Sequence, residues 1–141
     1  MRYFYIEPEV SGELGEGTLM DTTVHPPKVE KLNYEFSSWL GDDLIESFPC
    51  YIVSERLAER LKKSDFSGFY FDEVEVTKSS EFDEVSTIKH LTKFYWLKVE
   101  GKPFLSDIAI SEDQRLLVSE DLLTLMKSFH LNYADIELFE G

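Results

Sequence analysis

The segment YIVSERLAERLK, residues 51–62, decides the fold, because it contains a strand, a helix start and a helix in direct succession. Its first three residues are apolar and β-branched or aromatic, as is typical of a buried strand. Ser54 then offers a hydroxyl that can accept hydrogen bonds from the first free amides of a helix. We therefore predict a strand over 51–53, an N-cap at Ser54 and a helix over 55–63.

The same unit returns 65 positions later as LLVSEDLLTLMK, residues 116–127, which keeps the Val-Ser-Glu motif. It predicts a strand over 116–118, an N-cap at Ser119 and a helix from 120 to about 129. Val-Ser-Glu before a helix is also a common capping arrangement, so coincidence is the alternative to duplication. Alternating patterns then predict a further strand in each copy, over 69–76 and 134–139, and we interpret 51–76 and 116–139 as an internal repeat.

The remaining apolar segments complete an α+β domain. Strands are predicted over 3–6, 94–99 and 107–110. The length of 141 residues fits one domain spanning 1–141. We expect a mixed or mostly antiparallel sheet with two main helices, built around the duplicated strand-helix-strand unit.

Three segments lack a clear strand or helix pattern. Residues 8–27 carry three glycines and three prolines, which predicts a long loop suited to partner contacts. Residues 39–45 predict a turn into a short helix that is capped by Asp42 and ends before Pro49. Residues 78–92 predict a polar loop, with a short helix as the alternative.

The charge of the chain limits its partners. The 28 acidic residues exceed the 14 basic ones and give a net charge of -14, which repels nucleic-acid backbones and anionic membranes. The same charge would attract a basic protein, although acidity is also an ordinary route to solubility. We therefore expect no direct binding to nucleic acid.

Cysteine usage and hydropathy indicate the compartment. Cys50 is the single cysteine, so no internal disulfide can form, as is typical of the reducing cytoplasm. The first residues are apolar for too short a stretch to form a signal peptide, and no run of 18 apolar residues occurs. We expect a cytoplasmic protein that neither crosses nor anchors in a membrane.

The residues that could carry chemistry do not form a known catalytic pattern. His25, His90 and His130 lack metal-ligand spacing, and no histidine motif accompanies Cys50. Ser54 and Ser119 are interpreted as helix caps and nothing else, and the glycine spacing of a phosphate-binding loop is missing. We predict no catalytic residue, no metal site and no cofactor.

An acidic segment between residues 65 and 84 predicts a binding surface. It holds seven carboxylates against the single base Lys78, with aromatic residues between them. Such a mixture can hold a basic partner by apolar contact while the carboxylates attract it, although a solvated sheet face explains the pattern equally well. With the adjacent acids at positions 42 and 43, the predicted partner-binding residues are Asp42, Asp43, Phe69, Tyr70, Asp72, Glu73, Glu75, Glu81, Asp83 and Glu84.

The spaced pattern that starts with Tyr34, Phe36, Trp39 and Gly41-Asp42-Asp43-Leu44 resembles a family of immunity proteins from bacterial polymorphic toxin systems. It continues through Pro49, the Ile52-Val53-Ser54 motif and Gly68, and the Leu117-Val118-Ser119-Glu120 motif fits the same pattern, so the resemblance covers roughly residues 34–139. It implies a cytoplasmic protein that binds and neutralises a cognate toxin, often a basic nuclease. The surfaces of this family vary greatly, so the resemblance transfers no toxin-contacting residue.

Two other hypotheses compete with that of an inhibitor. The first is a small enzyme or ligand-binding protein whose site gathers dispersed groups such as Asp42, Asp43, His90 and Asp107. The second is a non-enzymatic adaptor, which differs from an inhibitor only in its partner. The sequence predicts no oligomeric state.

Overall fold

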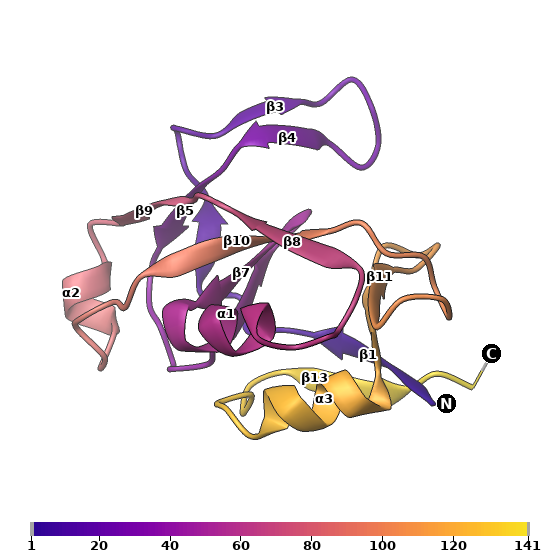
Figure 1. The fold of residues 1–141 in the computed structure, drawn as a ribbon. Helices are drawn as coiled ribbons and strands as arrows, with labels where there is room; N and C mark the ends of the chain where they lie inside the picture. The colour runs from indigo at the N-terminus through magenta and orange to yellow at the C-terminus, as the bar shows by residue number, and fades with distance from the viewer. Residues whose placement is uncertain (1, 141) are drawn as a thin grey trace.

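The structure is a computed structural model that describes residues 2–140. Within that range the chain forms thirteen strands and three helices (Figure 1). In chain order they are β1 (Tyr3–Glu7), β2 (Gly12–Leu14), β3 (Leu19–Asp21), β4 (Lys28–Lys31), β5 (Asn33–Phe36), β6 (Leu44–Ser47), β7 (Cys50–Ser54), α1 (Glu55–Lys62), β8 (Phe69–Asp72), β9 (Glu75–Lys78), α2 (Phe82–Val85), β10 (Phe94–Val99), β11 (Ile108–Ile110), β12 (Leu116–Ser119), α3 (Glu120–Lys127) and β13 (Asp135–Leu138). The predicted α+β class, with mostly antiparallel sheets and two main helices, is confirmed.

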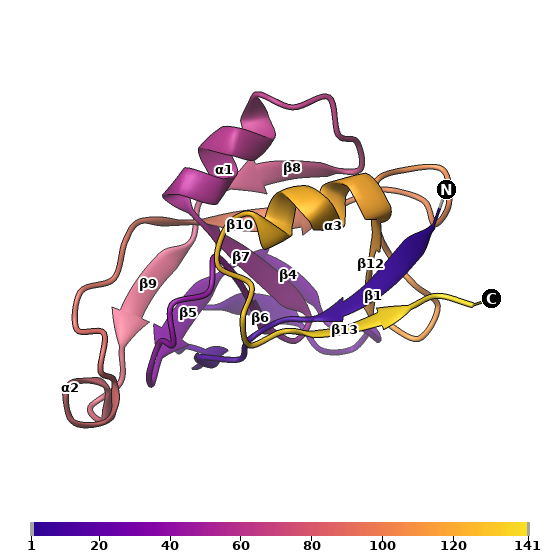
Figure 2. The same ribbon diagram turned by 90° about the horizontal axis from the view of Figure 1, so that it is seen from below.

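Two four-stranded antiparallel sheets form most of the molecule, in the orders β6-β7-β10-β8 and β11-β12-β1-β13. A three-stranded sheet, β2-β5-β9, adds the parallel pair β5 and β9. The strands β3 and β4 form a separate two-stranded hairpin. Figure 2 shows α1 and α3 as neighbours, and apolar residues of both helices belong to the same core cluster.

The two four-stranded sheets have the same construction, so the duplicated strand-helix-strand unit is present. In the first copy β10 lies between β7 and β8, and in the second β1 lies between β12 and β13. Even the entry into each helix matches, because Glu55 N donates to Lys93 O and Glu120 N donates to Arg2 O, both at 2.9 Å. Each unit therefore completes its sheet with a strand from outside the predicted repeat.

Both predicted N-caps are confirmed. Ser54 Oγ accepts a hydrogen bond from Leu57 N at 3.4 Å, and Ser119 Oγ accepts one from Leu122 N at 3.3 Å. Both serines have extended backbone conformations, as residues that precede the first helical turn require. The helices begin at the next residue in each case, as predicted.

Ser54 also donates, which corrects its interpretation as a cap and nothing else. Its hydroxyl donates to Asp43 Oδ1 at 2.5 Å, and Asp43 lies just before β6, the strand that pairs with β7. The other oxygen of this carboxylate, Oδ2, accepts from His130 N at 2.7 Å, in the loop after α3. Asp43 therefore joins the helix start of the first unit to the helix end of the second.

Asp107 makes the corresponding bonds from the second unit to the first, and it also accepts them. Its Oδ1 accepts from Ser119 Oγ at 2.9 Å, and its Oδ2 accepts from Ser67 N at 3.0 Å, in the loop after α1. Each of these aspartates thus precedes one unit and binds both the cap serine of that unit and the backbone of the other unit. We call Asp43 and Asp107 the linking aspartates.

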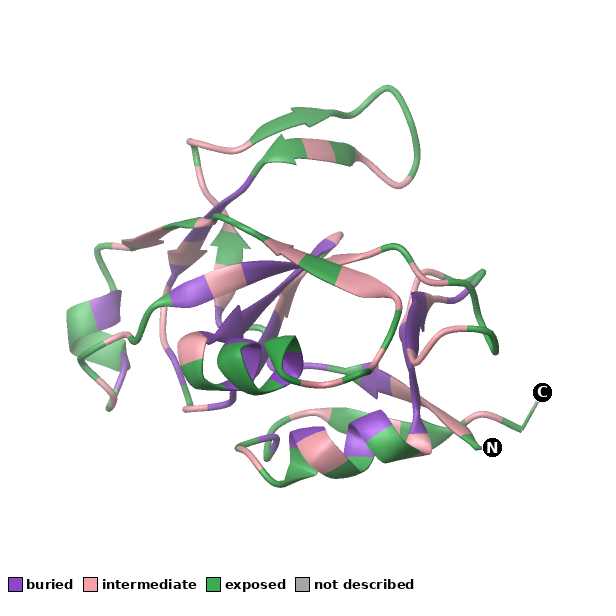
Figure 3. Cartoon of the chain, in the orientation of Figure 1, coloured by how far each residue is buried: buried purple, intermediate pink, exposed green. Residues whose placement is uncertain are grey.

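The core consists of two apolar clusters that meet at β7, whose five residues are all buried because both faces are covered (Figure 3). Val53 belongs to the cluster that contains residues of α1 and α3, whereas Ile52 belongs to an aromatic cluster with Phe36 and Phe94. Successive side chains of a strand point to opposite faces of its sheet, so the neighbouring residues Ile52 and Val53 enter different clusters.

Three predicted segments differ in the structure. Residues 44–47 form β6 and not a helix, because Leu44 and Ile45 are buried and pair with β7. Asp42 does not cap a helix here; its carboxylate accepts hydrogen bonds from backbone N–H groups in the loop after α3. The predicted loop over 8–27 contains β2 and β3. The predicted strand over 69–76 breaks after Asp72 into β8 and β9, which belong to different sheets.

Candidate partner-binding surface

Two of the predicted partner-binding residues lie inside the protein. Asp42 and Asp43 are both almost completely buried. The Asp42 carboxylate accepts from the N–H groups of Asn132 at 2.9 Å and Tyr133 at 2.8 Å. Asp43 accepts from Arg56 Nε at 2.7 Å and Nη2 at 2.8 Å, besides the two bonds described above. Both carboxylates hold the loop after α3, so neither faces a partner.

Electrostatics agree with this internal role for Asp43. Burial acts to raise the pKa of its carboxyl group, but the hydrogen bonds from Arg56, from the cap serine and from a backbone N–H outweigh burial. The pKa therefore lies below its ordinary value, and the group remains ionised inside the protein.

The other eight predicted residues lie outside the core, in two groups. β8 and β9 are each the edge strand of a sheet, whereas α2 lies at one end of the molecule (Figure 1). The edge group consists of half-buried Phe69 and of exposed Tyr70, Asp72, Glu73 and Glu75. The group beside and on α2 consists of Glu81, Asp83 and Glu84, all exposed.

Lysines from neighbouring elements offset the charge of this acidic segment. Lys98 Nζ lies 3.7 Å from Asp72, and Lys89 donates to the backbone carbonyl of Asp83. Residues 51–100 hold ten acidic and eight basic side chains, so the excess of carboxylates falls on the rest of the chain. The sequence count for residues 65–84 therefore overstates the local field.

The β3–β4 hairpin is the most prominent projection of the molecule (Figures 1 and 3). Its apolar side chains Leu19, Met20 and Val24 are 58%, 43% and 48% exposed. Only Val29 of the hairpin strands packs against a core cluster. Apolar side chains gathered on an exposed projection are typical of a surface that binds a partner.

A buried asparagine fixes the base of this hairpin. Asn33 Oδ1 accepts from Gly17 N, and its amide group donates to Glu75 O and Thr77 Oγ1, each at 3.1 Å. A Cβ atom on Gly15 would collide with Asn33 Oδ1, and the Asn33 side chain is fixed by these hydrogen bonds, so this close approach requires glycine. Although a two-stranded hairpin is marginally stable alone, this one is held in position by β5 and β9.

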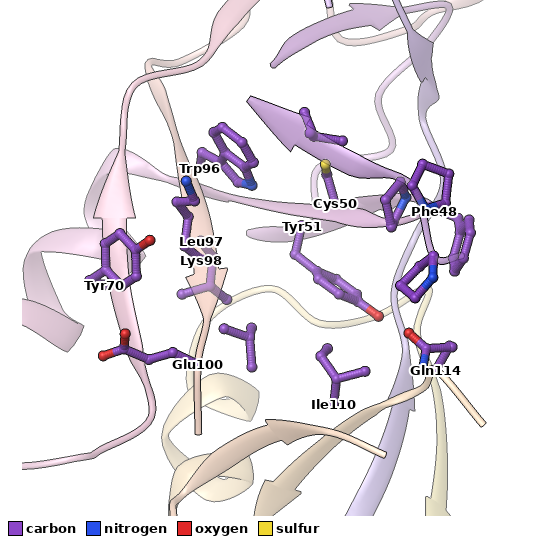
Figure 4. Close-up of a pocket in the computed structure, with 15 residues that line it drawn as sticks. Phe48, Cys50, Tyr51, Tyr70, Trp96, Leu97, Lys98, Glu100, Ile110 and Gln114 are labelled. Carbon is purple, nitrogen blue, oxygen red and sulfur yellow. The ribbon is translucent and has the colours of Figure 1, made fainter. Parts of the chain in front are cut away.

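An aromatic groove opens beneath the hairpin (Figure 4). Its volume is about 270 Å³. The hairpin contributes one wall, the β6–β7 turn a second, and β8 with β10 a third. The residues that define the groove are Pro26, Pro27, Val29, Phe48, Pro49, Tyr51, Tyr70, Trp96, Lys98, Glu100 and Gln114.

The groove carries one unpaired charge. Lys98 Nζ lies 4.2 Å from the centre of the Trp96 ring and 5.6 Å from that of Tyr70, and it pairs with Asp72. Within residues 2–140 no basic side chain forms an ion pair with Glu100, which is exposed at the groove. The groove thus combines aromatic walls with a free carboxylate.

Cys50 also lines the groove, in surroundings that disfavour the nucleophilic thiolate. Its side chain is buried, and burial raises the pKa of the thiol to about 12. In the part of the chain that the structure describes, no group of three His, Cys, Asp or Glu side chains is arranged to hold a metal ion. The polar groups of the groove include the side chains of Lys98 and Glu100.

Of the predicted residues, Tyr70 alone lines the groove. The sequence did not predict the hairpin wall of the groove, because the hairpin strands are only three and four residues long. An alternation of apolar and polar residues is not informative over so short a stretch. The available signal was the apolar pair Leu19-Met20 beside glycines and ahead of Pro26-Pro27.

Comparison of the chain with family models, with curated proteins and with solved structures found no match in any of the three. Over residues 2–140, none of the helices combines the length and the apolar character that a membrane span requires.

Proposed function

We propose that this protein is a stoichiometric inhibitor that binds a cognate, basic toxin, as immunity proteins of polymorphic toxin systems do. The observation that carries the proposal is the β3–β4 hairpin, which is hydrogen-bonded to the body at Asn33 and carries exposed apolar side chains above an aromatic groove. An arm that is already ordered loses little conformational entropy on binding. Such an arm suits a protein whose function is tight association.

The charge of the protein supports a basic partner. A net charge of -14 accelerates encounter with a cationic protein and disfavours association with nucleic acid. The resemblance to immunity proteins rests on residues such as Trp39, Asp42 and Asp43, which are buried. That resemblance therefore speaks for a shared scaffold, and the contacts come from surface residues particular to this chain.

Titration calorimetry with the purified product of the neighbouring gene tests the proposal. We expect one-to-one binding that weakens as salt increases, because screening reduces the attraction between opposite charges. Co-expression of the two proteins should also protect cells from that product. Absence of binding in low salt, or a neighbouring product without toxicity, would contradict the proposed function.

A matched pair of substitutions tests the role of the hairpin. Val24→Asp places a charge on the exposed hairpin, whereas Val85→Asp places the same charge on α2, where Val85 is 62% exposed. We expect Val24→Asp to weaken binding about tenfold and Val85→Asp to leave it within a factor of about two. Equal effects of the two variants would refute the assignment to the hairpin.

The alternative hypothesis of a small enzyme requires a site that gathers Asp42, Asp43, His90 and Asp107. Asp42, Asp43 and Asp107 are engaged in hydrogen bonds that hold the fold. The aromatic groove is lined by none of these aspartates, nor by His90.

A further inference from the structure

An acidic hollow adjoins the aromatic groove. Both depressions are lined by Tyr51 and Gln114, so they lie on either side of these two residues. The second hollow has a volume of about 600 Å³ and is lined by the carboxylates of Glu7 and Glu46, among others. The two depressions therefore form a surface with an aromatic end and an acidic end.

The rim of the acidic hollow is apolar. Val10, Leu40 and Tyr133 all line it, and all three have at least half of their surface exposed. They come from three separate segments of the chain, between β1 and β2, before β6 and before β13. Apolar side chains around a charged depression exclude water from a pair of charges that forms inside it.

The carboxylates in this hollow have no cation of their own. Within residues 2–140, neither Glu7 nor Glu46 forms an ion pair. Arg115 lines the hollow, but its guanidinium group pairs with Asp113 at 2.7 Å and with Glu137 at 3.3 Å. Burial and the nearby Glu7 raise the pKa of Glu46 to about 6, because its charge is poorly compensated.

Gln114, on the boundary between the two depressions, has an unusual backbone conformation. Its φ of 65° lies in the left-handed region, which residues other than glycine seldom adopt. The turn that contains it is fixed by hydrogen bonds from Gln114 N to Ser111 O at 2.9 Å and from Arg115 N to Ser111 Oγ at 3.1 Å. This turn holds the Gln114 side chain at the boundary of the two depressions (Figure 4).

We propose that the aromatic groove and the acidic hollow together form the docking surface for a basic protein, which inserts an apolar side chain beneath the hairpin and a lysine or arginine beside Glu46 and Glu7. This proposal rests on the proposed function and specifies which surface performs it. Charge complementarity identifies the occupant, because a carboxylate pair without a cation favours a ligand that supplies one. The apolar rim and the groove supply the area that such an interface requires.

Matched substitutions separate this surface from the acidic segment that the sequence indicates. Glu46→Gln removes a charge from the hollow, and Glu84→Gln removes one from exposed α2. In titrations with the purified product of the neighbouring gene, we expect Glu46→Gln to weaken binding about tenfold and to reduce its dependence on salt. We expect Glu84→Gln to change affinity by less than about a factor of two.

Hydrogen exchange on the wild-type complex provides a test that does not depend on variants. We expect binding to protect the amides of Tyr51 and Gln114, which line both depressions, and not those of α2. A larger effect of Glu84→Gln, or protection confined to residues 69–84, would overturn this docking surface while leaving the inhibitor function intact. If the wild-type protein does not bind the neighbouring product, the proposed function fails, and the docking surface fails with it.

Discussion

Buried carboxylates supply hydrogen-bond acceptors for loop amides that have no partner in a strand or helix. Glu9 accepts from Leu40 N at 2.9 Å and from Asp42 N at 3.3 Å. Asp42 in turn accepts from two amides of the loop after α3. Each such acceptor offsets the cost of an unsatisfied buried amide, about 1–3 kcal/mol. A sequence cannot reveal this role, because the amides that Asp42 serves lie ninety residues away.

Replacing Asp43 by Asn should lower the free energy of unfolding by about 2 kcal/mol, because an amide cannot accept every hydrogen bond that this carboxylate accepts. Since the folded-state pKa of Asp43 is lowered, its contribution is complete above the ordinary pKa and is lost as pH falls through the folded value. Urea denaturation should therefore show a constant difference between wild type and variant above about pH 5 that shrinks in stronger acid.

Asp72→Asn serves as the control for that measurement. Asp72 pairs with Lys98 at 3.7 Å on the surface, so its loss should cost less than about 0.5 kcal/mol. A similar loss from both variants would show that burial of the Asp43 carboxylate does not decide its contribution.

Glu46→Gln should stabilise the free protein by about 1 kcal/mol near pH 8, because it removes a poorly compensated charge. The folded-state pKa of Glu46 is raised from 4.5 to about 6, so wild-type stability falls as pH rises through this interval, whereas the variant should lack that slope. Thermal melts between pH 4 and pH 8 check the result. A variant that is less stable at pH 8 would show that Glu46 supports the fold.

Among the elements, the short strands depend most on their neighbours. The strands and helices of the two repeat units are predictable, because a cap serine and an apolar pattern coincide in each. β6 is not predictable in this way, since the Gly-Asp-Asp that precedes it resembles a helix start until its pairing with β7 is known. The β3–β4 hairpin, which forms one wall of the candidate site, depends likewise on a contact outside its own segment, at Asn33.

Asn33→Ala should release the hairpin from the body of the protein. The substitution removes the acceptor for Gly17 N and the donors to Glu75 O and Thr77 Oγ1. We expect faster amide exchange throughout residues 19–31 and a loss of about 2 kcal/mol in the free energy of unfolding. Ser37→Ala, at the other end of β5, is the control and should leave exchange in the hairpin unchanged. Unaltered hairpin exchange in Asn33→Ala would contradict the role of Asn33.

At the scale of the whole molecule, the two repeat units are interlocked. The linking aspartates each bind the cap serine of one unit and the loop of the other. The first core cluster contains apolar residues from both units, and β7 connects it to the second cluster. The repeat itself is visible in the sequence. The hydrogen bonds between the units are not, because the aspartates bind backbone N–H groups of distant loops, and no side-chain pattern marks those groups.

The protein should therefore unfold in one cooperative transition, although it has two core clusters and four sheets. Differential scanning calorimetry should give equal calorimetric and van't Hoff enthalpies, since neither unit retains its loops when the other opens. Asp107→Ala should lower the melting temperature of the entire protein. Two separate transitions in the wild type or in this variant would refute the interlocking of the units.

The position of β1 has a consequence for synthesis on the ribosome. β1 pairs with β12 and β13, which begin more than one hundred residues later in the chain. β1 must therefore remain without these partners until the segment that contains β12 and β13 has been made. A nascent chain that stalls before residue 116 exposes the apolar strand Tyr3–Glu7 as an unpaired edge, which is a template for aggregation. Yield in the cell should thus depend on the rate of elongation and on chaperones that bind the early strand.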